Sequence, residues 1–571
     1  MTPLDWAMIV VWVAGTSALG VYFRRCAGNT RDYLLAGRRL RWWQIGIAQS
    51  ADAVDANDFV AITGAGYRTG LSQLGYTWWG MGIGSVLLSR YVAPLLYRTG
   101  VYTNAEYLEL RFGPVLRVLS AVLQVLYRFV AMALVVYAVA MVFQVILGVQ
   151  LWIGIWVAMG LSLLYVLTSG QLGVVMAAIP QVGLMLLTAV LVFSYALAEI
   201  GGPEGFSRHA AEHPDLMRLS GHSEPGVPGG VYVWGLILAL VTYPIVNQTV
   251  AQRILGAASE ADGRKGTVVS LLPWCIVTGT SILVGVMAVD IVPGLVERQA
   301  DAVFPMLMAR YLPEGLLGLG VAALTVASMS TAAGIGTAIA GLMTVDVFRM
   351  FRRGETSDRA RLWATRGFAT AAIVCGTGFA MFIERFGGMI PFYVKFTGTF
   401  FLPLTVPYLG GAWFRWVSRG AGTAAVLGGI GVGAVLFLGG EPLPVGTGPP
   451  QWFFGERLPA WLAQAQWRPF WVLGAAWAVM IVWSLVENAL RGRIPEIEVG
   501  AWLNVRDLGR PCTPEELQQH VAATPAARPP RTDNLDRGAC GVPAHTPWYS
   551  HPTTFELAAV ALMIALMAWL W

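Results

Sequence analysis

Charged residues are scarce in this sequence. Asp, Glu, Lys and Arg together make up only 12% of the 571 residues, about half of their share in a typical soluble domain. Hydrophobic residues make up 56%, and the mean hydropathy is +0.60. A long chain with so little charge is typical of proteins embedded in a lipid bilayer. The composition therefore excludes an ordinary soluble protein and predicts a polytopic membrane protein.

Cysteine and histidine are also scarce, with five Cys and six His in the whole chain. The cysteines form no C-x-x-C motif and no Cys/His cluster, so the sequence predicts neither structural disulfides nor zinc sites. It contains no H-E-x-x-H or G-x-S-x-G motif and no local carboxylate–histidine cluster. We therefore expect no catalytic residues and do not expect a membrane-embedded enzyme.

What the sequence has instead is a series of apolar runs of about 20 residues, the length of a membrane-spanning helix. About fourteen such spans are expected, so the predicted fold class is all-α. They lie near residues 4–22, 42–63, 75–97, 118–146, 150–168, 171–198, 231–251, 267–291, 316–346, 364–383, 388–412, 421–439, 468–488 and 553–571.

Arginine and lysine are concentrated in alternate loops between these spans. They crowd the loop after the first span and follow the third, seventh and ninth, whereas the loops at 199–230 and 440–467 are rich in Gly and Pro. Positive charge marks cytoplasmic loops, so the pattern predicts an integral protein of the cell membrane with its N-terminus outside. The polar segment 489–552 is then cytoplasmic, and it is too short to be a catalytic or signalling domain.

Three aspartates interrupt the second predicted span, in the stretch SADAVDANDF. Asp52, Asp55 and Asp58 are three residues apart and would form one stripe on a helix, although each costs about 2.5–3.5 kcal/mol at the centre of a membrane. One interpretation is a charge network in which Arg128 and Lys395 neutralise carboxylates, with Asp52 paired across the bundle. The other is a pocket wall that faces a cation, for which Asp55 and Asp58 are the favoured members.

A second polar stretch, ASMST, lies in the ninth predicted span and places Ser330 beside Thr331. Small and hydroxylated residues allow helices to pack closely, and their hydroxyls can bond to the preceding turn. Adjacent hydroxyls can also serve as hard oxygen ligands for a small cation. Both interpretations are open at this point.

The order of several motifs resembles that of the sodium–solute symporter family. The stretches that carry this resemblance are DYLLAGRRLRWWQIG (32–46), TGAGYRTGL (63–71), TNAEYLELRFGPVLR (103–117), NQTVAQRILGAASEADGRKG (247–266), ASMSTAAG (327–334), TVDVFR (344–349) and FLPLTVPYLGGAWFRW (401–416). Each motif alone is loose, but the ordered set is specific and extends from about residue 5 to about residue 490. The chain is therefore identified as a member of this family.

The resemblance implies sodium-coupled symport by alternating access, carried out by ten core helices in two inverted repeats of five. The first helix of each repeat is broken in the family, and Pro244 in TYPIVNQ fits such a break because proline disfavours a continuous helix. The expected segments are a first peripheral helix (1–30), a first repeat (42–198), an extracellular loop (199–230), a second repeat (231–412), peripheral helices (413–488), a cytoplasmic linker (489–552) and a last helix (553–571).

The resemblance also assigns a sodium site, residue by residue, to Ala51 and Val54 in the second span and to Ala327, Ser330 and Thr331 in the ninth. The first three would offer backbone carbonyls and the last two hydroxyl oxygens, which suit sodium as a hard cation. Sodium is the only metal ion and the only cofactor expected.

The sequence departs from relatives that bind a second sodium ion. Where they carry aspartates, this chain has Ala332, Ala333 and Gly334 after the hydroxyl pair, and Ala178, Ile179 and Pro180 in the sixth span. We therefore expect one sodium ion per substrate.

The expected substrate site consists of Asp55, Asp58, Tyr76, Thr77 and Asn247. Tyr76 and Asn247 match the sugar-transporting relatives, but Ala53, Asp58 and Thr77 replace their Asn, Gln and Glu. A buried carboxylate favours a positive partner, so we expect a small polar solute that is cationic or zwitterionic. The alternatives are a sugar or another neutral solute, or a sensor or channel that reuses the fold. Membrane lipid is the expected surrounding, and no nucleic acid or obligate protein partner is expected.

Overall fold

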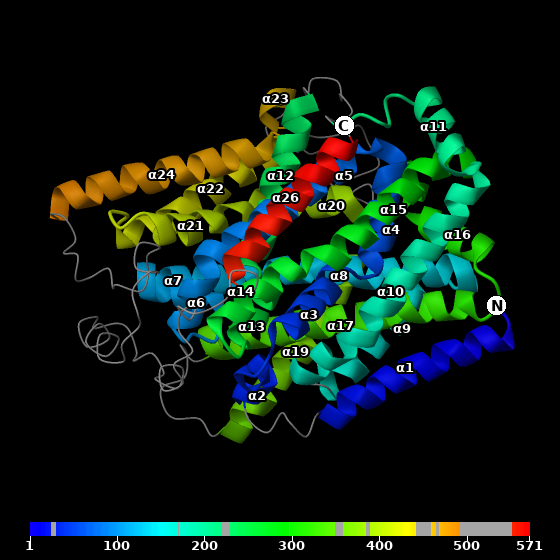
Figure 1. Ribbon diagram of the computed structural model, residues 1–571. Coiled ribbons are helices and arrows are strands. Elements are labelled where there is room, and N and C mark those ends of the chain that lie inside the picture. The colour runs from blue at the N-terminus through cyan, green and yellow to red at the C-terminus, as the bar shows by residue number, and fades with distance from the viewer. Residues whose placement is uncertain are drawn as a thin grey trace, which may run out of the picture.

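The computed structural model describes residues 1–23, 30–168, 171–219, 229–295, 297–348, 358–383, 389–440, 458–463, 467–491 and 551–570. Over these residues the chain is a bundle of helices, and many of the long ones run along roughly the same direction or its reverse (Figure 1). The only isolated β pairing in this described part is one parallel bridge between Leu40 and Ala257. The predicted all-α fold class is confirmed.

The first half of the chain contains the first broken helix and the longest helix. Its helices are α1 (Pro3–Phe23), α2 (Thr30–Leu35), α3 (Trp42–Ala53), α4 (Ala56–Thr69), α5 (Ser72–Leu87), α6 (Ala93–Arg98), α7 (Asn104–Phe112), α8 (Pro114–Leu147), α9 (Leu151–Thr168), α10 (Gln171–Glu199) and α11 (Gly202–Glu212). A π-helical turn, Leu88–Val92, connects α5 to α6, and a 3-10 turn, Ala36–Arg38, follows α2.

The second half repeats the motif of a broken helix followed by long ones. Its helices are α12 (Gly229–Val246), α13 (Gln248–Leu255), α14 (Glu260–Val269), α15 (Leu271–Ile291), α16 (Val303–Tyr311), α17 (Leu316–Gly341), α19 (Asp358–Ala380), α20 (Met389–Phe396), α21 (Thr405–Trp413), α22 (Arg419–Gly440), α23 (Ala460–Ala463), α24 (Arg468–Arg491) and α26 (Pro552–Leu570). Short 3-10 or π-helical turns occupy Glu297–Ala302, Leu342–Phe348, Thr397–Phe401 and Leu402–Leu404.

Helix occupies every range in which a span was expected. Seven helices in the described part are long and apolar enough to cross a membrane, and an eighth is obtained if the bent pair α12 and α13 is one span. The count of about fourteen therefore stays a prediction, as do the expected segment boundaries. The expected cytoplasmic linker 489–552 lies almost entirely outside the described residues.

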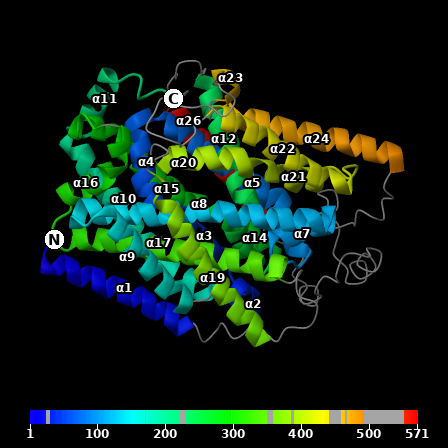
Figure 2. The ribbon, with the colours of Figure 1, turned by 180° about the vertical axis from the view of Figure 1, so that it is seen from behind.

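The peripheral helices α1 and α24 lie on opposite sides of the bundle, and both views show this arrangement (Figure 1, Figure 2). Between them, glycines let core helices approach closely. A Cβ atom at Gly285 of α15 would lie 2.1 Å from the carbonyl oxygen of Thr63 in α4, and one at Gly66 would lie 2.6 Å from the carbonyl oxygen of Ile282. Only glycine fits at such contacts, which are typical of helix packing in membranes.

Candidate functional site

The second expected span is broken at the aspartates. Helix α3 ends at Ala53, Val54 and Asp55 are extended, and α4 begins at Ala56. The last carbonyls of a helix have no partner within it and carry a partial negative charge, so the end of α3 is suited to a cation. The break therefore exposes backbone oxygens in the middle of a buried segment.

The seventh expected span is broken in the same way. Helices α12 and α13 meet at Asn247 with a bend of 40°, three residues after Pro244. The Asn247 side-chain oxygen caps α13 by accepting hydrogen bonds from the backbone N–H groups of Thr249 and Val250, at 2.8 and 3.3 Å. The expected pair of broken helices is thus present.

The structure brings the five expected sodium ligands close to the first break. The Thr331 hydroxyl donates a hydrogen bond of 3.2 Å to the carbonyl oxygen of Ala51, which links α17 to the end of α3. The Ser330 hydroxyl lies 3.0 Å from the carbonyl oxygen of Ala327. Val54 follows α3 directly, and all five residues are buried. These hard oxygens are of the type that sodium prefers.

Sequence reasoning missed one polar group at this cluster. Gln181 of α10 is fully buried, and its side-chain oxygen accepts a hydrogen bond of 2.7 Å from the Ser330 hydroxyl. It directly follows Ala178, Ile179 and Pro180, where an aspartate was sought and not found. A glutamine offers a neutral oxygen at this place, so it adds a ligand type that suits sodium without adding charge.

Asp52 forms an ion pair that the sequence interpretation did not name. Arg253 of α13 binds its carboxylate through Nε at 3.0 Å and through Nη2 at 2.7 Å to each oxygen. The expected seventh span ended at residue 251, with Arg253 in a loop, but α13 continues to Leu255 and buries Arg253 completely. Arg128 lies within electrostatic range of Asp52 but is not its ion-pair partner. The Lys395 side chain lies outside the described part.

Asp55 and Asp58 form a capping box at the start of α4. The Asp55 carboxylate accepts a hydrogen bond of 2.7 Å from the backbone N–H of Asn57, and the Asp58 carboxylate accepts one of 3.3 Å from the backbone N–H of Asp55. Such reciprocal bonds satisfy N–H groups that have no partner inside the helix. The Asp55 carboxylate also interacts with the hydroxyl of Thr331. Among the described side chains, neither aspartate forms an ion pair.

The other expected substrate residues are buried on two helices. Tyr76 of α5 packs with Leu236 and Ile237 of α12, and the Thr77 hydroxyl accepts a hydrogen bond of 3.3 Å from the side chain of Gln73. Asn247 is 3% exposed, and its side-chain nitrogen has no hydrogen-bond partner in the described structure. This amide is therefore a buried donor that is available to a ligand.

Arg128 of α8 is the second basic group near the aspartates. It is 3% exposed, and its Nε and Nη2 atoms have no hydrogen-bond partner among the described residues. Its guanidinium group lies 5.4 Å from the ring centre of Tyr127, whose hydroxyl is 3.2 Å from that of Tyr393. Tyr243 and Tyr393 are each within electrostatic range of both Arg128 and Asp58. An acid and a base are thus both near the same pair of tyrosines.

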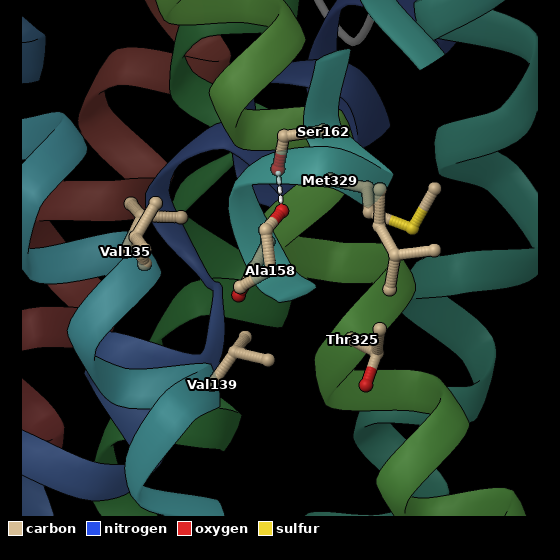
Figure 3. A pocket seen from close by; sticks show the side chains of 9 residues that line it. Val135, Val139, Ala158, Ser162, Thr325 and Met329 are labelled. Carbon is tan, nitrogen blue, oxygen red and sulfur yellow. Dashed lines mark hydrogen bonds between the residues drawn. The ribbon is translucent and has the colours of Figure 1, made fainter. Parts of the chain in front are cut away.

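A small cavity lies elsewhere, between α8, α9 and α17 (Figure 3). It is lined mainly by apolar side chains, among them Val135, Val139 and Met329, together with Ser162, whose hydroxyl donates to the carbonyl of Ala158. None of its lining residues belongs to the expected sodium or substrate sites. The cavity does not change the assignment of either site.

The positions that lack the aspartates of two-sodium relatives are filled by other contacts. Gly334 faces the ion pair, since a Cβ atom there would lie 3.1 Å from Asp52 Oδ1 and 3.7 Å from Arg253 Nη2. Ala332 and Ala333 are fully buried in the hydrophobic core. A Cβ atom at residue 334 would therefore require the Asp52 carboxylate to shift by a few tenths of an ångström.

Comparison with known proteins agrees with the resemblance seen in the sequence motifs. The sequence matches the Sodium:solute symporter family over residues 33–428. It is 27% identical to a sodium/glucose cotransporter of Vibrio parahaemolyticus, over 73% of this chain and 82% of that protein. It is 26% identical to sodium/myo-inositol cotransporter 2 of Mus musculus, over 75% of this chain and 69% of that protein. It is 24% identical to sodium/glucose cotransporter 1 of Oryctolagus cuniculus, over 64% of this chain and 61% of that protein.

Solved structures share the fold. The structure of a Na⁺-coupled sialic acid symporter in a substrate-bound, outward-open state superposes with a TM-score of 0.70 at 16% identity, over 85% of this chain and 98% of the other. A nucleobase-cation-symport-1 family transporter bound to bromovinylhydantoin gives a TM-score of 0.51 at 13% identity, over 80% and 95%. At these identities the likeness concerns the fold alone.

Two broken helices with oxygen groups at their breaks, in this shared fold, together with the match to the family over residues 33–428, define an inverted-repeat sodium-coupled transporter. The chain belongs to the sodium:solute symporter family. Its family and relatives are transporters and not enzymes, and sodium is the coupling ion.

Proposed function

We propose that this protein carries a small zwitterionic solute across the cell membrane together with one sodium ion, by alternating access. The observation that carries the proposal is the pair of opposite charges, Asp58 and Arg128, near Tyr243 and Tyr393. Neither charge is matched by an ion-pair partner in the described structure. A substrate that brings both an amine and a carboxylate would neutralise both.

The acidic half of the proposed site is inferred from the partners of the three aspartates. Arg253 already neutralises Asp52, so this residue does not need a ligand. Asp55 and Asp58 accept only backbone and hydroxyl hydrogen bonds, and neither has an ion-pair partner among the described side chains. A buried charge without a partner is costly, and a substrate ammonium group would remove that cost.

The basic half of the site rests on Arg128. A guanidinium group presents five N–H donors in a plane and binds carboxylates through two parallel hydrogen bonds. Two of the Arg128 nitrogens, Nε and Nη2, have no acceptor in the described structure, and they are the pair that a carboxylate would engage. With Asn247 as a further donor, Tyr76 and Thr77 would line the rest of the pocket.

The sodium part of the proposal rests on Ala51, Val54, Ala327, Ser330 and Thr331. Neutral oxygens from these residues and from Gln181 lie near the break. Of the two aspartates next to Ala51 and Val54, Asp52 is paired with Arg253, and Asp55 has no ion-pair partner among the described side chains. One acidic group balances the charge of one sodium ion. This balance supports a ratio of one sodium ion per substrate.

Competition for sodium-driven uptake into proteoliposomes tests the substrate class. The panel compares amino acids with the matching amines, the matching carboxylic acids and sugars. Zwitterions should compete best, and Asp58→Asn or Arg128→Gln should weaken their binding about 10- to 100-fold, the effect of losing one charge-assisted hydrogen bond. Each variant's melting temperature in detergent is the control for folding. Near-normal affinity and near-normal melting of Asp58→Asn would reject its role.

The second candidate is a neutral polar solute such as a sugar. Relatives named for glucose and myo-inositol, together with the matching residues Tyr76 and Asn247, favour it. The aspartate and the arginine then have no assigned partner, which is why this candidate comes second. Competition by sugars but not by zwitterions in the same panel would select it.

A further inference from the structure

Two histidines and an aspartate meet at one end of the bundle, far from the sites described above. His209 lies in α11, His213 follows the last residue of α11, and Asp290 is the residue before the end of α15. His209 Nδ1 lies 2.5 Å from one carboxylate oxygen of Asp290, and His213 Nε2 lies 3.0 Å from the other. In Figure 1, α11 and α15 lie beside each other near the end of the bundle that also holds α16.

The three side chains supply a ligand set for a transition metal. One ligand atom from each residue lies within 4.8 Å of the others. Around a tetrahedral zinc ion, with bonds of about 2.0–2.2 Å, neighbouring ligand atoms are about 3.3 Å apart, so small side-chain shifts would admit the ion. Zinc accepts two imidazoles and a carboxylate as ligands. Histidines four residues apart, as His209 and His213 are, can bind one zinc ion from the same side of a helix.

One ligand of the cluster is buried and the other two are partly exposed to solvent. The His209 side chain is 1% exposed, and its Nε2 has no hydrogen-bond partner in the described structure, so its polar contact is with Asp290. His213 and Asp290 are 34% and 39% exposed, which leaves room for solvent to supply a fourth ligand. A site with three protein ligands and one open position is one that an ion can enter from water.

The cluster joins segments that are distant in sequence. Asp290 lies in the last turn of α15, and the chain that follows α11 also contacts the turn between α4 and α5, where the carbonyl oxygen of Leu216 accepts a hydrogen bond of 2.7 Å from the backbone N–H of Leu71. This approach requires Gly70, because a Cβ atom there would lie 2.1 Å from the same oxygen. The α11 segment thus touches the ends of both α4 and α15.

We propose that His209, His213 and Asp290 form a binding site for Zn²⁺ or a similar transition-metal ion, which fastens α11 to the end of α15. The ion would take the place of the two contacts that now join the imidazoles to the carboxylate. Because alternating access requires the ends of core helices to change their packing, the bound ion should also slow transport.

Isothermal titration calorimetry with ZnCl₂ and the purified, metal-free full chain tests the site. We expect one tight binding event that is weakened at least about tenfold in His213→Ala and in Asp290→Asn, both of which are partly exposed positions. His551→Ala is the matched control, since His551 is a histidine outside the cluster. Cysteines are the same in all variants, so the comparison isolates the cluster. MgCl₂ should give no such event, because magnesium prefers oxygen ligands.

Zinc should raise the melting temperature of the wild type and of His551→Ala but not of His213→Ala. Equal zinc binding by the wild type, His213→Ala and Asp290→Asn would overturn the site, as would no tight binding by the wild type. Zinc added on the side of the 199–230 loop should reduce sodium-driven uptake by the wild type more than by His213→Ala. Zinc binding without any change in uptake would overturn the coupling to transport.

Discussion

The ion pair between Asp52 and Arg253 allows a quantitative test. Asp52→Asn keeps the shape of the side chain but removes its charge, which leaves Arg253 as a buried cation. The pair has three contacts of 2.7–3.0 Å, and its side chains are 6% and 0% exposed. Breaking such a buried pair costs about 3–5 kcal/mol, because one charge stays in the interior without its counter-ion.

The double variant separates the charge from the position. Asp52→Asn combined with Arg253→Gln removes both charges and allows an amide hydrogen bond, so most of the lost stability should return. The matched surface control is Asp215→Asn, since the Asp215–Arg218 pair is 64% and 63% exposed and should contribute at most about 1 kcal/mol. Unfolding in mild detergent, followed at several salt concentrations, measures these differences. A buried pair should show little dependence on salt.

A substitution of Arg128 distinguishes the Asp52–Arg253 pair from the alternative charge network, in which Arg128 would neutralise an aspartate. Arg128 has two unbonded nitrogens and no ion pair among the described residues, so Arg128→Gln should leave stability nearly unchanged. The reasoning is refuted if Arg128→Gln destabilises the protein as much as Arg253→Gln does. It is equally refuted if Asp52→Asn loses no more stability than Asp215→Asn.

Two further predictions concern sodium. Ser330→Ala and Thr331→Ala should each raise the sodium concentration for half-maximal uptake, with smaller effects on protein abundance, and wild-type sodium dependence in both variants would contradict the assigned site. The reversal potential of uptake should give one sodium ion per substrate, because Ala332, Ala333 and Gly334 offer no further acidic ligand. A measured ratio near two would contradict this count.

Hydropathy was enough to place the long helices, because the apolar interior of a membrane requires long apolar segments. Each expected span contains helix, and the breaks at Asp55 and Asn247 were expected from the family resemblance. Helix α11, in contrast, lies in a range that was expected to be a loop. The hydroxyl pair at residues 330 and 331 was recognisable because its neighbours in the chain form a motif. Local sequence therefore predicted the long helices and suggested the part of the candidate sodium site that one helix carries.

The contacts that cross between helices were not predictable in the same way. Arg253 is 201 residues from Asp52 and was assigned to a loop by its charge, although the helix that carries it continues into the core. Gln181 is 149 residues from Ser330, and Asp290 is 81 residues from His209. Nothing in one sequence marks which distant polar residues become neighbours. The capping box had a local signal, since Asp55 and Asp58 have the spacing of a helix N-cap and its third residue.

That capping box explains why a transporter would keep carboxylates at a helix break. The Asp55 carboxylate reaches the Thr331 hydroxyl of the candidate sodium site, while its backbone N–H donates to Asp58 of the candidate substrate site. A cation bound at the break would attract the Asp55 carboxylate. Any movement of Asp55 would also shift its backbone N–H, which donates a hydrogen bond to the Asp58 carboxylate. Coupling between two ligands is reciprocal and typically amounts to about 1–3 kcal/mol, which a change in one or two buried hydrogen bonds can supply. The residues that start α4 would thus connect the two candidate sites through contacts that the fold already needs to form the helix.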